Sequence, residues 1–394
     1  MASVCCYFQV HQPRRLRRYS VFDSNPTYFD DFHNEQILLK VANKCYLPAT
    51  RLILDLVRRH EGRFRASYSV TGCVIEQFRR YCPEMIDLLA QLAETRCIEF
   101  LCETSHHSLS FLYSRNEFKA QVDLHAALMQ DLFGQTPQVF RNTELIYNND
   151  LASFIGGLGR FGGILVEGAD HILGHRSPNY IYMAPGEQDL RLLLKNYRLS
   201  DDIAFRFSDK GWSEWPLTAE KFTQWVHQIN GDGYMCNLFL DYETFGEHQW
   251  EDTGIFQFLE ALPQHILDTG ANDFKTPSEC LEAFDAVGEY DVPHMISWAD
   301  TERDLSAWLG NAMQSNALHE LYKLEEPIKQ CGREEMLNDW RDLTTSDHFY
   351  YMCTKYFADG DVHKYFNPYE SPYDSYINFM NVLDNLRTRV EVTA

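Results

Sequence analysis

Short apolar runs that end abruptly in polar or titratable residues recur along the first 250 residues of the chain. The seven runs cover residues 4–10, 64–70, 97–101, 139–140, 163–166, 192–194 and 238–240. Their length and their branched and aromatic side chains predict buried β-strands. Apolar residues at helical spacing follow several of the runs, as in residues 34–59, 83–95, 116–133 and 145–158. The pattern therefore predicts strands that alternate with helices.

Strands that alternate with helices favour a parallel sheet. Chemistry-bearing residues at the carboxyl end of each strand are typical of a closed β/α barrel, whose active site lies on that face. A doubly wound open sheet is the alternative that the pattern leaves open. Because seven strands are one fewer than the common (β/α)8 barrel contains, we expect an α/β fold built on an incomplete (β/α)7 barrel.

The pattern changes from about residue 253, where helical spacing dominates and strand candidates are few. The helical runs cover residues 254–269, 278–287, 304–329, 333–355 and 373–389. No linker rich in proline, serine or glycine precedes them, so the two parts are expected to share a core. The predicted domains are a catalytic barrel over residues 1–285 and a helical region over residues 286–394 that packs on the barrel and contributes to the cleft.

Two carboxylates, Glu144 and Asp241, each follow a predicted strand directly. Glycoside hydrolysis needs such a pair, because one carboxylate attacks the anomeric carbon or activates water while the other protonates the leaving oxygen. Arg141, just upstream, could keep Glu144 ionised. Asp241 needs apolar neighbours to hold a proton near neutral pH, and Tyr242 and Phe245 are the candidates.

The charge of the chain argues against one class of partner. There are 35 Lys and Arg residues against 57 Asp and Glu residues and no basic stripe, so we expect no nucleic acid to bind. The aromatic content of 14% is high and suits flat, hydroxyl-rich ligands. Trp212, Trp215, Trp250 and Trp298 lie in loop-like stretches and are candidate stacking platforms, whereas Trp225, Trp308 and Trp340 fall on helical spacing and are predicted core residues.

Histidines near the predicted strand ends suggest an alternative chemistry. They are His11, His106, His107, His171 and His248, with Asp170 beside them, and imidazole with carboxylate suits zinc. None of the usual zinc-binding spacings occurs among them, so we favour hydrogen bonds to sugar hydroxyls and expect no metal and no cofactor. The glycines of residues 156–163 follow a helix and precede a strand, the reverse of a phosphate-binding loop, and are interpreted as a helix stop.

The cysteines and the N-terminus indicate the cellular compartment in which the protein is expected. Eleven cysteines without a repeating spacing are interpreted as reduced thiols. The apolar run at the N-terminus has no positive lead and stops at His11, so neither a signal peptide nor a membrane span is expected. These features predict a cytoplasmic protein that does not bind membranes, and they leave its oligomeric state open.

Five stretches carry a resemblance to a known family: residues 11–13, 72–77, 140–144, 240–246 and 298–314. On these stretches the chain resembles α-amylase-type members of glycoside hydrolase family 57 over nearly its full length. The resemblance implies a (β/α)7 barrel followed by helices, retaining cleavage of α-glucan linkages and no required metal. It implies Glu144 as the nucleophile and Asp241 as the general acid/base. The expected substrate-binding residues are His11, Glu76, Glu243 and Asp304 from the resemblance, with His107, Trp250 and Trp298 from the patterns above.

The expected function is a retaining glycoside hydrolase that cleaves α-1,4 linkages of glycogen, starch or maltooligosaccharides. A 4-α-glucanotransferase or branching enzyme is the first alternative, because the family contains such enzymes and the motifs do not reveal how well acceptor sites exclude water. A glucan-binding protein without turnover and a zinc-dependent carbohydrate deacetylase are the others.

Overall fold

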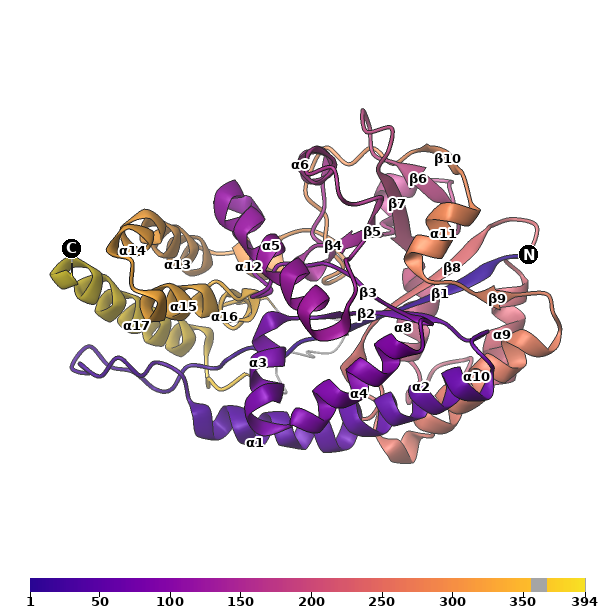
Figure 1. Cartoon of the computed structure of the whole chain (residues 1–394), viewed down its shortest axis with the longest axis horizontal. Coiled ribbons are helices and arrows are strands. Elements are labelled where there is room, and N and C mark those ends of the chain that lie inside the picture. Colours follow the sequence, from indigo (N-terminus) through magenta and orange to yellow (C-terminus); the bar gives the residue numbers. More distant parts are fainter. Residues whose placement is uncertain (356–366, 394) are drawn as a thin grey trace.

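Seven parallel strands lie at the centre of the described part of the chain, residues 1–355 and 367–393 of a computed structural model (Figure 1). They are β1 (Ser3–Val10), β2 (Ala66–Val70), β3 (Ile98–Phe100), β4 (Val139–Arg141), β5 (Gly163–Glu167), β7 (Arg191–Lys195) and β8 (Met235–Asp241). Each coincides with one of the apolar runs. All eight residues of β1 are buried, as expected for a strand covered on both faces.

The strands form two hydrogen-bonded sheets, ordered β3-β2-β1-β8 and β7-β5-β4, that meet at two seams. At one seam a single bridge joins Cys102, just after β3, to Phe140 of β4. At the other, the Asn237 side-chain amide donates to the Leu194 carbonyl oxygen at 2.8 Å, and the Asn237 carbonyl accepts from the Asn196 amide at 2.9 Å. These sparse contacts complete a ring of seven strands, which confirms the expected incomplete (β/α)7 barrel.

Helices surround the barrel, and their ends follow local sequence signals. They are α1 (Asp31–Val41), the π-helix η1 (Ala42–Tyr46), α2 (Leu47–Arg59), α3 (Gly72–Tyr81), α4 (Pro83–Glu94), α5 (Arg115–Phe133), α6 (Asn149–Gly157), α7 (Asp170–Leu173), α8 (Tyr197–Ala204), α9 (Ala219–His227), α10 (Ile255–Asp268) and α11 (Pro277–Ala283). The Thr71 and Ser114 side chains cap α3 and α5 by accepting backbone N–H groups. Gly134, in the left-handed region, ends α5.

Two predicted helices differ from the structure. The run 145–158 is helical only from Asn149, because Glu144 and Leu145 adopt positive φ angles of 57° and 50° and Asn148 caps the helix. The run 278–287 leaves the helix after Ala283 and continues as β10 (Ala286–Glu289), which pairs with β6 (Ile181–Met183). Strands β6, β10 and β9 (Asp273–Phe274) were not predicted, since two to four residues are too few to show a period.

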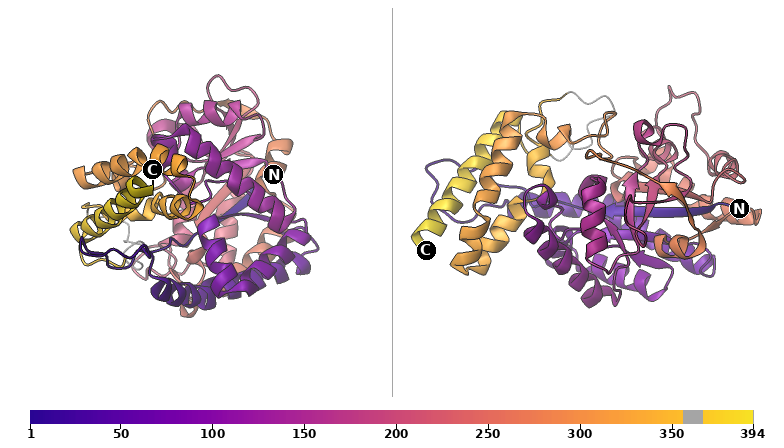
Figure 2. Two further views of the ribbon diagram at one scale, coloured as in Figure 1. Left: turned by 60° about the vertical axis from the view of Figure 1, so that its left-hand side comes forward. Right: turned by 90° about the horizontal axis from the view of Figure 1, so that it is seen from above.

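A helical region covers the carboxyl ends of the barrel strands (Figures 1 and 2). It contains α12 (Ser306–Leu309), α13 (Ala312–Lys323), α14 (Glu325–Cys331), α15 (Glu334–Leu343), α16 (Ser346–Tyr350) and α17 (Pro372–Thr393). Trp308 and Trp340 are buried in its core, as predicted. Residues 356–366 of the predicted helical region lie outside the described residues.

The segment before α1 packs on the last helix, α17. The Tyr19 amide donates to Asn378 Oδ1 at 2.6 Å, and the Tyr28 hydroxyl donates to Asn385 Oδ1 at 2.7 Å. The start and the end of the chain therefore share a hydrophobic cluster. Strand β10 lies after residue 285, in the predicted helical region, but it pairs with β6 of the predicted barrel. Each predicted domain therefore has elements that pack with the other.

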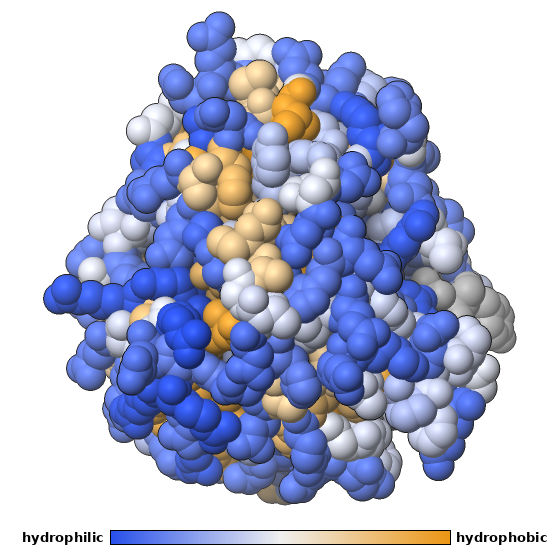
Figure 3. Space-filling model, turned by 90° about the vertical axis from the view of Figure 1, so that its right-hand side faces the viewer, coloured by the Kyte–Doolittle hydropathy of each residue, from blue (hydrophilic) through white to orange (hydrophobic). Residues whose placement is uncertain are grey.

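The opposite end of the molecule, where the N-terminus lies, is mostly hydrophilic, with a narrow band of apolar side chains (Figure 3). Of the helices in residues 1–355 and 367–393, none has the length and apolar character needed to cross a bilayer. The charged strand ends lie at the other end of the barrel, beneath the helical region.

Candidate active site

One pocket lies at the carboxyl ends of the barrel strands and brings together residues from distant parts of the sequence. Seven residues singled out in the sequence line it: His11, His107, Glu144, Asp241, Glu243, His248 and Trp298. Asp347, Tyr350 and Tyr351 of the helical region line it as well. The pocket therefore belongs to both parts of the chain.

Glu144 enters the pocket from a strained turn. It lies in the short 3-10 helix η3 (Thr143–Leu145), and it and Leu145 both have positive φ angles, a conformation that costs roughly 1–3 kcal/mol per non-glycine residue. Three side chains hold the carboxylate. The Trp298 indole N–H donates to Oε2 at 2.7 Å, His107 Nε2 lies 3.2 Å from Oε1, and the Ser346 hydroxyl donates to Oε1 at 3.5 Å.

A buried relay of charges supports Glu144. His107 Nδ1 lies 3.0 Å from Oε2 of Glu103, whose side chain has no exposure to solvent. Burial favours the neutral ring, but hydrogen bonds to Glu103 and Glu144 outweigh it and raise the pKa of His107 to about 9. Burial also opposes ionisation of Glu103, yet His107 and the nearby Arg141 lower its pKa to about 2. Near neutral pH, Glu144 therefore faces an imidazolium ion.

Arg141 acts on Glu144 less directly than expected. Its guanidinium is fully buried, 4.0 Å from Glu103 and 4.9 Å from the centre of the Trp298 ring. It thus lies against Glu103, which is bonded to His107, and against Trp298, which donates to Glu144.

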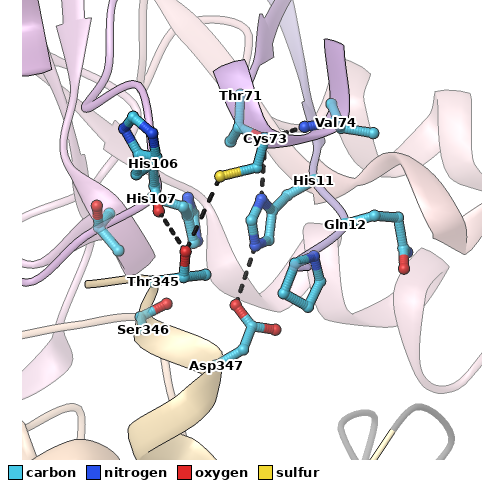
Figure 4. A network of polar contacts seen from close by, with 12 residues as sticks. His11, Gln12, Thr71, Cys73, Val74, His106, His107, Thr345, Ser346 and Asp347 are labelled. Atoms are coloured by element: carbon cyan, nitrogen blue, oxygen red, sulfur yellow. Dashed lines mark hydrogen bonds and ion pairs between the residues drawn. The ribbon is translucent and has the colours of Figure 1, made fainter. Parts of the chain in front are cut away.

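His11 connects the barrel to the helical region (Figure 4). Its Nδ1 lies 2.9 Å from the Thr71 hydroxyl, and its Nε2 lies 2.9 Å from Asp347 Oδ2. The ring stacks on His107 with 4.1 Å between centroids. Burial and the neighbouring charge of His107 lower the pKa of His11, so it is a neutral group between two charged ones.

Asp241 ends β8 on another side of the pocket and is followed by Glu243 in the 3-10 helix η4 (Tyr242–Thr244). Glu243 is buried and accepts hydrogen bonds from the Tyr46 hydroxyl and, at 3.3 Å, from Gln12 Nε2. Burial, together with the charge of Asp241, raises the pKa of Glu243 to about 8. Two full negative charges are therefore disfavoured on this pair.

The expectation that Tyr242 and Phe245 form apolar walls around Asp241 is wrong. Both rings are buried in the barrel core against Phe8, with centroid distances of 5.4 and 5.6 Å, and neither lines the pocket. The Tyr242 hydroxyl is 2.9 Å from that of Thr50, behind the strand. Phe239 and Leu240, which precede Asp241 on β8, do line the pocket.

Trp298 is held in place by charged groups. Arg303 donates to its carbonyl oxygen, and Lys195 Nζ lies 5.3 Å from the ring centroid. Arg303 and Lys195 each lie within 4 Å of the carboxylates of Glu167 and Asp201. Since its indole N–H is bonded to Glu144, Trp298 orients that carboxylate as well as lining the pocket.

Three predicted substrate-binding residues lie outside this pocket. Glu76 is exposed on α3, and Asp304 is exposed and accepts the backbone N–H of Ser306. Trp250 lines a separate surface groove. A role for these three in binding substrate stays a prediction.

Of the histidines considered as metal ligands, His11, His107 and His248 line the pocket, whereas His106 and His171 do not. His171 is exposed on α7, and His106 is bonded to Ser105 at 2.7 Å. Within residues 1–355 and 367–393, no group of three or more His, Cys, Asp or Glu side chains has a geometry that could hold a metal ion.

The family model described as "Glycosyl hydrolase family 57" matches residues 5–293 of this chain. The chain belongs to glycosyl hydrolase family 57. This confirms the resemblance, and the matched residues include Glu144 and Asp241. Asp347 lies beyond them, on the helical region, and outside all the sequence motifs considered above.

Relatives agree with this membership. A protein of Methanocaldococcus jannaschii with the name "Putative alpha-amylase" is 41% identical over 390 residues, which cover 95% of this chain and 82% of that protein. Two solved structures share the fold of this chain at low identity. A 4-α-glucanotransferase from Thermococcus litoralis superposes with a TM-score of 0.69 at 14% identity, over 97% of this chain and 60% of its own length. An α-amylase from Thermotoga maritima gives a TM-score of 0.64 at 12% identity, over 100% of this chain and 95% of its own.

Proposed function

We propose that this family 57 protein is a retaining hydrolase of α-1,4-glucans such as glycogen, starch or maltooligosaccharides. Glu144 attacks the anomeric carbon and forms the glycosyl-enzyme intermediate, and Asp241 protonates the leaving oxygen and then takes a proton from water. The observation that carries this proposal is the different surroundings of the two carboxylates in one pocket. Glu144 faces an imidazolium ion, whereas Asp241 faces a second carboxyl group.

Each set of neighbours suits one role. The imidazolium of His107 and the indole N–H of Trp298 favour the ionised form of Glu144, which a nucleophile requires. Near Asp241, burial and mutual repulsion with Glu243 favour retention of a proton by the pair, which an acid catalyst requires. His11, stacked on His107 and bonded to Thr71 and Asp347, holds the helical region against this side of the pocket.

The test is turnover of maltooligosaccharides by wild type, Glu144→Gln and Asp241→Asn. We expect each variant to lose at least about a thousandfold in kcat, since each removes a group that bonds to or exchanges protons with the reacting atoms. In Glu144→Ala, added azide should restore turnover and give a glucosyl azide inverted at the anomeric carbon. Glu99→Gln, on strand β3 but bonded to Ser278, is the matched control. Near-wild-type rates in either active-site variant would contradict the assignment.

Hydrolysis is favoured over glucan transfer by the 41% identity to a protein named as an α-amylase, of which the chain spans 82%. Maltotriose alone distinguishes the two. A hydrolase releases new reducing ends, whereas a 4-α-glucanotransferase makes longer oligosaccharides at a constant number of ends.

A reducing compartment such as the cytoplasm is part of this proposal. All eleven cysteines are free thiols, and nine of them are buried. This supports the prediction made from their spacing.

A further inference from the structure

A second concave surface lies on the flank of the barrel. It is bounded by η1 and the start of α2, by the loop after β8, and by α10. Its volume of about 910 Å³ is within the range usual for ligand sites, roughly 300–1,000 Å³. None of its lining residues lines the active-site pocket, so it is a separate surface.

Trp250 is the most conspicuous residue of this groove. Its side chain is 53% exposed, although tryptophan is usually largely covered by protein. Pro48 and Phe256 provide further apolar lining, and the exposed amide of Gln257 and carboxylate of Asp252 lie at the edge. A flat ring beside hydrogen-bonding side chains suits a sugar, which has both apolar ring faces and hydroxyl groups.

The charge of the groove limits the chemical class of ligand that it can bind. Among the described lining residues, Glu251, Asp252 and Glu260 are acidic and Lys44 is basic, with its Nζ 5.0 Å from the centroid of the Trp250 ring. Arg59, which is not a lining residue, lies 3.0 Å from the Glu260 carboxylate. An anionic ligand would be repelled by this excess of carboxylates. Neutral hydroxyl groups, in contrast, can donate to carboxylates and amide oxygens.

The groove shares two elements with the active site. The π-helix η1 carries Lys44 into the groove and, two residues later, Tyr46, whose hydroxyl donates to Glu243. Lys44 Nζ also lies 3.6 Å from the buried carboxylate of Glu247. A π-helical turn is rare and is frequently found at functional sites. Trp250 belongs to the same loop as Glu243 and Glu247, so the groove and the Asp241–Glu243 pair are built from common segments.

We propose that this groove is an accessory site that binds a segment of an α-glucan polymer, with Trp250 stacked on a glucose ring. The ligand class rests on the proposed function of the active site. The groove binds one segment of the polymer while the active-site pocket acts on another segment of it, at a chain end or within a loop.

Native gel electrophoresis through glycogen tests this inference without any turnover. In the Glu144→Gln background we expect glycogen to slow migration, and we expect Trp250→Ala to raise the apparent Kd for glycogen about tenfold. Gln257→Ala should weaken binding in the same direction, by a smaller factor. Phe22→Ala, which removes a 93% exposed ring far from the groove in sequence, is the matched control and should bind like its parent.

The outcomes separate the alternatives. Equal retardation of parent and Trp250→Ala, or no retardation of the parent, would overturn the accessory site. A parent that forms a dimer, dissociated by Trp250→Ala with unchanged glycogen binding, would show instead that the groove contacts a second copy. Retardation by a soluble β-glucan but not by glycogen would overturn the ligand class. Failure of the proposed function would appear separately, as absent maltooligosaccharide turnover by wild type.

Discussion

Replacing Glu103 by glutamine removes one charge from the relay behind Glu144 while keeping the shape of the side chain. Glu103 has no solvent exposure, and its carboxylate is hydrogen-bonded to His107 at 3.0 Å and to Gln9 Nε2, also at 3.0 Å. A glutamine can keep both contacts as neutral hydrogen bonds. The perturbation therefore tests the charge of the relay rather than its packing.

The size of the expected effect on kcat follows from the pKa of His107. Its pKa of about 9 in the folded protein, against an ordinary 6.5, corresponds to roughly 3 kcal/mol in favour of the imidazolium. Glu103 and Glu144 share this stabilisation, so losing the Glu103 charge removes roughly half of it. In Glu103→Gln the pKa of His107 should fall toward its ordinary value, and Glu144 should face a neutral ring at pH 8.

The sign of the pH dependence follows from these pKa values. Below pH 6.5 His107 is charged in wild type, and the variant differs least from wild type in kcat. Between the lowered pKa of His107 in the variant and pH 9 the ring is charged mainly in wild type, so in that range kcat of the variant should be lower by about tenfold. For stability, the raised pKa of His107 contributes most below pH 6.5, and this contribution is lost as the pH rises through 9. The lowered pKa of Glu103 adds stability above pH 4.5 that is lost as the pH falls toward 2.

The assays are kcat on a chromogenic maltooligosaccharide from pH 5 to 9.5 and titration of the His107 ring by NMR. Glu99→Gln, the same change on strand β3 just before Glu103, should follow the wild-type profile. If the ratio of wild-type to Glu103→Gln rates were the same at pH 6 and pH 8.5, or if the ring titrated alike in both, the charge relay would be refuted.

Two further substitutions test the surroundings of the site. Trp298→Phe removes the N–H that donates to Glu144 at 2.7 Å, so kcat on maltooligosaccharides should fall about tenfold, and a rate within twofold of wild type would contradict this role. Gly246→Ala places a Cβ 2.0 Å from the Lys44 carbonyl oxygen at a φ of 119°, so urea unfolding should show a loss of about 3 kcal/mol or more. Gly270→Ala, with positive φ but no atom within 4 Å, should cost about 1 kcal/mol and is its control.

Much of the barrel and part of the site were predictable from local pattern. Parallel strands bring their carboxyl ends to one face, so residues that follow strands directly, such as His11, Glu144 and Asp241, were expected to meet. The structure places all three around one pocket. Periodicity sufficed here because strand order and direction alone determine which residues converge.

The rest depended on tertiary packing that no local pattern encodes. In the sequence, Asp347 is one of several acidic residues in a predicted helical run. Only the packing of the helical region against the barrel brings it to 2.9 Å from His11. The positive φ of Glu144 is invisible to periodicity, because non-glycine residues rarely adopt it. His107 was expected to bind sugar, yet both of its ring nitrogens are bonded to carboxylates. Spacing indicates that a histidine is near a site, but not which way its ring faces.

The different surroundings of Glu144 and Asp241 show how one pocket can give two carboxylates different chemical roles. The chain places a cation, His107, between Glu103 and Glu144, so negative charge on Glu144 is compensated inside the protein. It places a second carboxyl group, Glu243, two residues after Asp241 and buries it, so negative charge there is opposed. Environments that push paired groups toward different protonation states are the physical basis of acid and nucleophile roles. The relay to Glu103 and the contact with Glu243 therefore matter as much to the proposed chemistry as the two carboxylates themselves.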